Sequence, residues 1–157
     1  MQSIDSKQAE RVWSRVMNSH ASEQAKPACD FNTGVMQMIA EARQDAALYA
    51  CLAEKLCGKG RRLLQELYAE KRRQLRTLGA VYFLSAGTKA CPERGKPVCI
   101  TCVNESLRQQ HKKSLHTAEC YRSFAAQAGC HGCVFERLAK NEAENADRIL
   151  CVLEACL

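Results

Sequence analysis

The sequence predicts an all-α protein, a bundle of four long helices. Two stretches with helical periodicity, Val35–Leu56 and Leu64–Leu84, are joined by a short turn that contains glycine. Two more, from about Glu105 to Gln127 and from about Val134 to Ala155, are joined in the same way. Apolar residues recur in them at steps of three and four, which keeps their side chains on one helical face. Helices of about 20 to 25 residues with short links are typical of a bundle.

The chain of 157 residues is long enough for one domain with its own core, and we interpret residues 1–157 as a single domain. Residues 1–33 are predicted to form an N-terminal helix, about Ile4 to Met17, followed by a linker. The helix would carry an apolar patch that includes Trp13. Residues 34–157 are predicted to form the four-helix bundle.

The apolar stripe of the first long helix is unbroken, but the stripes of the second and fourth helices each contain two polar residues. Lys71 and Gln74 interrupt the second helix, and Glu142 and Asn145 interrupt the fourth. The predicted stripe positions are Val35, Ile39, Ala42, Ala46, Tyr49, Ala53 and Leu56; Leu64, Tyr68, Leu75, Leu78 and Tyr82; Leu107, His111, Ser114, Ala118, Tyr121 and Ala125; and Leu138, Ile149, Val152 and Cys156 beside the last polar pair.

Glycine and proline mark the connections between these helices. Cys57-Gly58-Lys59-Gly60 is predicted to be the first turn, and the stretch Gly129 to Cys133 the last. The segment between the second and third helices, Gly87 to Asn104, contains two glycines and two prolines, which forbid a continuous helix. We therefore expect a long middle connection that crosses from one end of the bundle to the other.

The hydropathy and charge of the sequence argue against a secreted, membrane-spanning or nucleic-acid-binding protein. The first residues lack the apolar core of a secretory signal, and no apolar run approaches the roughly 18 residues of a membrane span, so we expect a cytoplasmic protein without a membrane partner. The formal net charge is +6, with arginine and lysine crowded on the second helix. Most helices display such charges on a solvated face, and aromatic residues for base stacking are few, so a nucleic-acid partner is not expected.

Three groups of residues carry a resemblance to a known family. The first and third helices contain Tyr49 and Tyr121, and the second and fourth contain the stretches Ala69 to Gln74 and Asn141 to Ala146. The N-terminal segment contains Glu10-Arg11-Val12-Trp13. When these residues are aligned with the family's motifs, the chain resembles the rubrerythrin-like branch of the ferritin-like superfamily, including its bacterial members. The resemblance implies a ferritin-like bundle with the long crossover between the second and third helices.

The same resemblance implies that the family's diiron site is degenerate here. The family's first and third helices each give a glutamate seven residues before a tyrosine, and its second and fourth each give Glu-x-x-His. The matching positions are Ala42 on the first helix, Lys71 and Gln74 on the second, Ser114 on the third, and Glu142 and Asn145 on the fourth. One carboxylate facing an ammonium cannot offset the charge of two iron ions, so no diiron cofactor is expected.

The resemblance also predicts which side chains fill the space that the two iron ions would occupy. In the family, the second-helix and fourth-helix carboxylates bridge the two metals, so the resemblance places Lys71 and Glu142 face to face. A carboxylate in an apolar layer is usually paired or protonated. We therefore predict that they form an ion pair, with Gln74, Ser114 and Asn145 supplying hydrogen bonds; the alternative is that Lys71 extends along its stem to the surface.

Eleven cysteines are the outlier of the composition. The odd number and the absence of a secretory signal argue against a disulfide framework. A free cysteine is commonly a small buried hydrophobe, and we interpret Cys51, Cys120 and Cys151 as packing residues.

The other eight cysteines divide into two groups. Cys99-x-x-Cys102 and Cys130-x-x-Cys133 flank the third helix, whose rise of 1.5 Å per residue separates them by about 30 Å. In the ferritin-like topology, one pole of the bundle gathers Cys57, Cys99, Cys102 and Cys156. The other pole gathers Cys29, Cys91, Cys130 and Cys133. Four thiolates suit a structural zinc ion, while an iron–sulfur cluster, reversible disulfides and plain burial stay open.

Two functions remain. The first is a non-catalytic structural or interaction protein whose cysteine clusters bind zinc or sense redox state. The second is a rubrerythrin-like diiron oxidoreductase or peroxidase that uses a metal site this register does not reveal. The ferritin-like resemblance and the N-terminal helix with Trp13 also imply a homodimer. The sequence names no substrate and no protein partner.

Overall fold

The computed structural model describes residues 30–156, and in that range it contains four α-helices, one short 3-10 helix and no strand. The elements are α2 (Phe31–Lys55), α3 (Gly58–Ala86), α4 (Val103–Ala125), η1 (Gly129–His131) and α5 (Gly132–Ala155). The all-α prediction is confirmed. The predicted helix from Ile4 to Met17 lies outside the described residues. None of the helices in residues 30–156 combines the length and the apolar character needed to cross a membrane.

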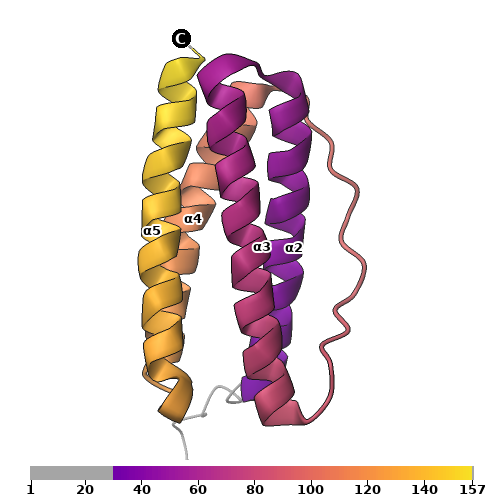
Figure 1. The fold of residues 1–157 in the computed structure, drawn as a ribbon, viewed down its shortest axis with the longest axis vertical. Coiled ribbons are helices and arrows are strands. Elements are labelled where there is room, and N and C mark those ends of the chain that lie inside the picture. The colour runs from indigo at the N-terminus through magenta and orange to yellow at the C-terminus, as the bar shows by residue number, and fades with distance from the viewer. Residues whose placement is uncertain (1–29, 157) are drawn as a thin grey trace, which may run out of the picture.

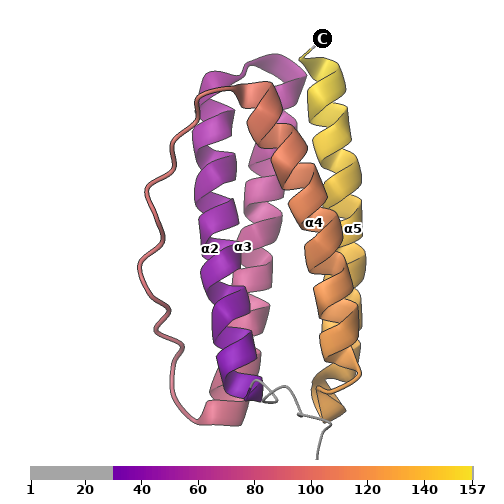
Figure 2. The same cartoon turned by 180° about the vertical axis from the view of Figure 1, so that it is seen from behind.

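The four helices form two hairpins that pack together. α2 packs along α3, and α4 packs along α5. Between the hairpins, residues 87–102 run along the outside of the molecule from one end to the other (Figures 1 and 2). The α2–α3 turn, the start of α4 and the end of α5 therefore share one end, as predicted, and the end of α3 shares the other with η1. The long crossing connection is confirmed.

The apolar core consists of two clusters, one toward each end of the bundle. One contains Val35, Leu78 and Phe135, with Phe31 stacked on Phe124 beside it. The other is built by the residues Tyr49, Leu52, Leu64, Leu67, Leu107, Ile149 and Val152. On each helix the buried polar residues lie between the two clusters. The polar layer is thus enclosed by apolar packing above and below.

The buried face of α3 differs from the prediction by one residue in places. Leu67 is fully buried and Val81 nearly so, whereas Tyr68 is 36% exposed and Tyr82 is half-buried. From Leu64 the observed positions follow steps of three, four, three, four and three, the regular alternation of a helical seam. On α4 the buried residue is Gln110, and His111, the predicted stripe position, is half-buried.

Two glycines define the ends of α3. Gly58 was predicted to lie in a turn, but it begins the helix with φ of 58°, and only Leu56 and Cys57 link α2 to α3. Gly87 ends the helix with φ of 73°, and its N–H donates to Phe83 O at 2.9 Å. Such a left-handed cap favours glycine, because a Cβ is strained there.

Candidate functional site

A buried ion pair occupies the middle of the bundle. Lys71 and Glu142 are both fully buried. The Lys71 Nζ donates to Glu142 Oε1 and Oε2, each at 2.8 Å. This joins α3 to α5 through a charge-assisted contact with both carboxylate oxygens. The predicted pair is confirmed, and the alternative of a Lys71 side chain that reaches the surface is wrong.

A second carboxylate, which the sequence reasoning did not place here, completes the charge balance. Asp45 on α2 is 3% exposed, and its Oδ2 lies 3.2 Å from Lys71 Nζ. Its Oδ1 accepts from Lys113 Nζ of α4 at 2.5 Å. Asp45 lies three residues after Ala42 and four before Tyr49, so the stripe spacing could have revealed it. Two ammonium groups and two carboxylates thus connect all four helices.

The pKa values of Lys71, Tyr49 and Tyr121 are shifted in directions that agree with this arrangement. Burial by itself would lower the pKa of Lys71, but the carboxylates of Glu142 and Asp45 offset this and raise it above its ordinary value. Lys71 is therefore a fixed cation, not a proton donor at neutral pH. Burial raises the pKa of Tyr49 to about 12 and also raises that of Tyr121.

Hydrogen bonds around Glu142 agree with two of the three predicted donors. Gln74 Nε2 donates to Glu142 Oε2 at 3.0 Å, and Asn145 Nδ2 does so at 3.4 Å. The prediction that Ser114 donates a hydrogen bond to this pair is wrong, because its buried Oγ has no hydrogen-bond partner among the described residues. A serine hydroxyl lies only one bond beyond Cβ, and from α4 it does not reach the carboxylate. Gln74 Oε1 is likewise without a partner in residues 30–156.

These side chains do not suit two iron ions. Ala42 is 2% exposed and contributes only a methyl group to the packing. The Lys71 ammonium lies directly on Glu142, the carboxylate that would have to coordinate, and it carries the positive charge itself. His116, the imidazole in the neighbouring cavity of about 360 Å³ between α2 and α4, is exposed at its margin. The donor set is that of a charge-balanced core and not of a diiron centre.

The cysteines lie mostly on the surface. Cys57, Cys91, Cys99, Cys102, Cys130 and Cys133 are exposed, Cys156 is half-buried, and Cys29 lies outside the described residues. The prediction that Cys120 and Cys151 are packing residues is wrong, because both are exposed, whereas Cys51 is half-buried. Cys120 lines the cavity between α2 and α4. Every cysteine between residues 30 and 156 is a free thiol.

The predicted sets of four cysteines share ends of the bundle but do not converge. The start of α4 and the end of α5 lie at one end of the bundle, and the end of α3 and η1 lie at the other (Figures 1 and 2). In the described part of the chain, however, no three histidine, cysteine, aspartate or glutamate side chains are placed to hold one metal ion. Metal binding by these cysteines stays a prediction. Of the ten cysteines that the structure describes, only Cys120 has a specific partner, with its Sγ 3.5 Å from His116 Nε2.

The pKa of the Cys120 thiol is raised, not lowered. Its partial burial and the nearby carboxylates of Glu41 and Glu119 raise the pKa of its thiol. A raised pKa leaves less thiolate at neutral pH, and the thiolate is the reactive form. The pair with His116 therefore lacks the charge environment of a cysteine hydrolase.

No protein-family model, curated protein or solved structure matches the chain.

Proposed function

We propose that this chain is a ferritin-like, rubrerythrin-like helical bundle without a working diiron centre, and that it acts as a non-catalytic structural or interaction protein. One observation carries the proposal: the middle of the bundle is filled by Lys71 paired with Glu142 and Asp45. An iron pair needs several carboxylate and imidazole ligands. Here the Lys71 ammonium lies against the two carboxylates, and the charges neutralise one another.

We propose further that the cysteines give the bundle its chemistry, as zinc ligands or as redox-sensitive thiols. The support is their exposure, since eight of the ten described cysteines are exposed and none is buried. Free cysteine is among the most buried residue types in proteins, so this distribution is unusual for packing residues. Among the thiols of residues 30–156, none converge on one metal position, which favours reversible oxidation, or metal shared with a second chain, over a closed zinc site.

Metal analysis of the purified, reduced protein tests the first part. We expect zinc or no metal. Stoichiometric iron with an oxo-bridged absorption band would contradict the proposal and favour a diiron oxidoreductase. The Lys71→Glu variant is the matched comparison, because it restores a carboxylate at the position where the resemblance expects one. Iron uptake by this variant alone would support the view that Lys71 replaces a metal.

Thiol counting tests the second part. The reduced protein is titrated with a thiol reagent before and after treatment with a zinc chelator, and again after mild peroxide. Zinc ligation predicts more reactive thiols after chelation, whereas redox sensing predicts fewer after peroxide and full recovery with a reductant. Thiols that respond to neither treatment would contradict both roles.

A further inference from the structure

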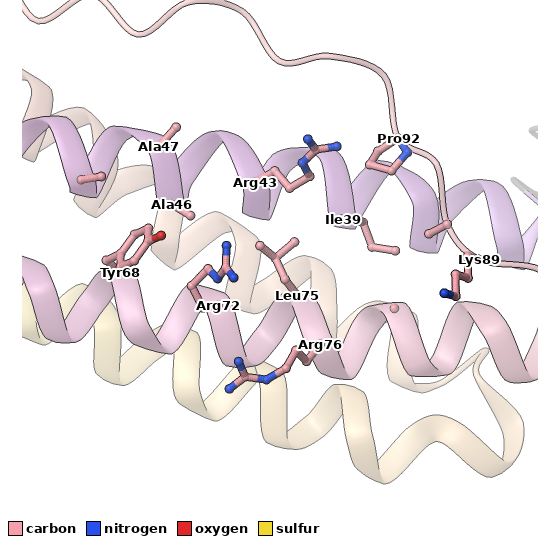
Figure 3. A pocket seen from close by; sticks show the side chains of 13 residues that line it. Ile39, Arg43, Ala46, Ala47, Tyr68, Arg72, Leu75, Arg76, Lys89 and Pro92 are labelled. Carbon is pink, nitrogen blue, oxygen red and sulfur yellow. The ribbon is translucent and has the colours of Figure 1, made fainter.

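A groove runs along the face where α2 and α3 pack together, next to the start of the long connection (Figure 3). Its volume of about 700 Å³ falls within the range of roughly 300 to 1,000 Å³ that is typical of small-molecule sites. Residues 39–50 of α2 line it over a helical rise of about 16 Å. The groove is therefore long enough for an extended molecule and too small for a folded partner.

The floor of the groove is apolar and narrow. Ile39 and Leu75 contribute branched side chains, while Ala46, Ala50 and Gly79 keep the surface low. A Cβ added at Gly79 would meet nothing within 4 Å, so the space above this part of α3 is open. Such a floor buries a slim apolar body well and offers it no polar partner.

The margin of the groove is cationic. Arg43 of α2, Arg72 and Arg76 of α3 and Lys89 of the connection all line it, and no aspartate or glutamate does. In residues 30–156 none of the four takes part in an ion pair. Three separate elements thus bring uncompensated positive charge to one concave surface, which a single solvated helix face would not do.

The close-up view shows how these cations lie relative to the floor. Arg72 points from α3 toward α2 and is flanked by Tyr68 and Leu75, while Arg43 lies near Pro92 on the opposite side (Figure 3). Arg72 therefore points across the groove, whereas Arg43 extends from α2 toward Pro92 at its side. A guanidinium offers paired N–H donors that match a carboxylate or a phosphate.

We propose that this groove binds a small amphipathic anion. The carboxylate or phosphate head is held by Arg72, with the other cations of the margin adding to the positive charge around it, and the apolar body, such as an acyl chain, lies along the alanine-lined floor. Both parts of the ligand are matched by chemistry in the groove, the head by unpaired cations and the body by apolar surface. The groove contains no cysteine and lies outside the Lys71 cluster, so this inference is independent of the function proposed above.

Calorimetric titration of the full-length reduced protein tests the proposal with four probes. Decanoate and decyl phosphate, each below its aggregation concentration, carry head and body together. Decanol carries only the body, and inorganic phosphate only the head. We expect both amphiphiles to bind, with affinities about tenfold or more above those of decanol and inorganic phosphate, because a charge-assisted hydrogen bond has a comparable effect. The stronger of the two amphiphiles identifies the natural head group.

Variants locate the binding. Arg72→Gln is expected to weaken binding of the amphiphiles about tenfold or more, while Arg122→Gln, an exposed position on α4 outside the groove, leaves it unchanged. Helical content of each variant is checked by circular dichroism. Equal binding of decanol and decanoate, equal losses in the two variants, or no binding of either amphiphile would overturn the proposal. Loss of dimer mass in Arg72→Gln without any anion binding would assign the groove to a second copy of the chain.

Discussion

At the scale of single residues, the buried cluster depends on Lys71 more than on any other side chain. In the part of the chain that the structure describes, its ammonium is the only charged group in contact with both Glu142 and Asp45. Asp45 keeps Lys113 when Lys71 is removed, but among the described residues Glu142 has no second cation. Glu142 would then be a charge enclosed in the core with only amide donors beside it. The unequal dependence of the two carboxylates makes the cluster testable by substitution.

The Lys71→Met variant is expected to be less stable than the parent by roughly 3 to 5 kcal/mol, because removing one partner of a buried pair leaves the other charge uncompensated. The double variant Lys71→Met with Glu142→Leu removes both charges and is expected to be close to the parent in stability. Denaturant unfolding measures both. Lys112→Met, at an exposed lysine of α4, is the control and should change little. A single variant as stable as the parent would refute a structural role for the pair.

Alkaline pH is expected to destabilise the fold. The pKa of Tyr49 is raised from 10.0 to about 12, so the folded state holds this proton more tightly than the unfolded state does. Its contribution to stability is complete below pH 10 and is lost as pH rises through about 12. The raised pKa values of Lys71 and Tyr121 act in the same direction.

Free energies of unfolding measured from pH 8 upward check this expectation. Tyr49→Phe should show a shallower decline, since a phenylalanine has no proton to lose. Only the slopes are compared, because the substitution also removes the contact with Gln110 Nε2 at 3.3 Å. A stability that stays level or increases above pH 10 would be inconsistent with the burial of these phenols.

At the scale of elements, the two glycines in the C-terminal half of α3 are expected to respond in opposite ways to alanine. Gly87 has φ of 73°, which strains any residue with a Cβ, so Gly87→Ala should lower stability by about 1 to 2 kcal/mol. Gly79 lies inside the helix and an added Cβ meets open space, so Gly79→Ala should raise stability by about 0.5 to 1 kcal/mol.

Thermal unfolding of these two variants and the parent measures the difference. Each substitution adds the same methyl group to the same helix, so each is the control for the other. Equal effects of the two would show that the helix does not end at Gly87 in solution.

The helices themselves were predictable from the sequence, and their ends and surfaces less so. Periodicity placed Lys71 and Glu142 on the apolar stripes of their helices, and the family resemblance placed them face to face. Periodicity did not distinguish Leu67 from Tyr68, since both fit a helical step and only packing against α2 and α5 selects between them. The exposure of Cys120 and Cys151 was missed because a cysteine's sequence position does not tell whether its thiol packs or reacts. Asp45 was missed because the expected carboxylate was sought one turn earlier, at Ala42.

At the scale of the whole molecule, we expect a homodimer in solution. The prediction rests on the resemblance to ferritin-like bundles, which commonly pair side by side, and on the N-terminal segment with Trp13. Light scattering at micromolar concentration should give twice the chain mass of 17.5 kDa. A clean monomer mass would refute this prediction, and loss of the dimer in Trp13→Ala would place the contact near the N-terminus. Ser123→Ala, at an exposed position of α4, serves as the control.

The division of the bundle into two hairpins has a consequence for how the chain assembles. Each hairpin has only a two- to six-residue link between its helices, whereas residues 87–102 separate the hairpins, so local contacts can form each hairpin before the two meet. Asp45 and Lys71 then belong to one half, and Lys113 and Glu142 to the other. Apolar stripes alone would tolerate sliding by one helical turn, about 5.4 Å. The charges would not, because such a shift separates Glu142 from Lys71 and Lys113 from Asp45. Asp45 would keep Lys71, which lies in the same half, but Glu142 would be left without a cation among the described residues, and the cluster therefore selects a single alignment of the two halves.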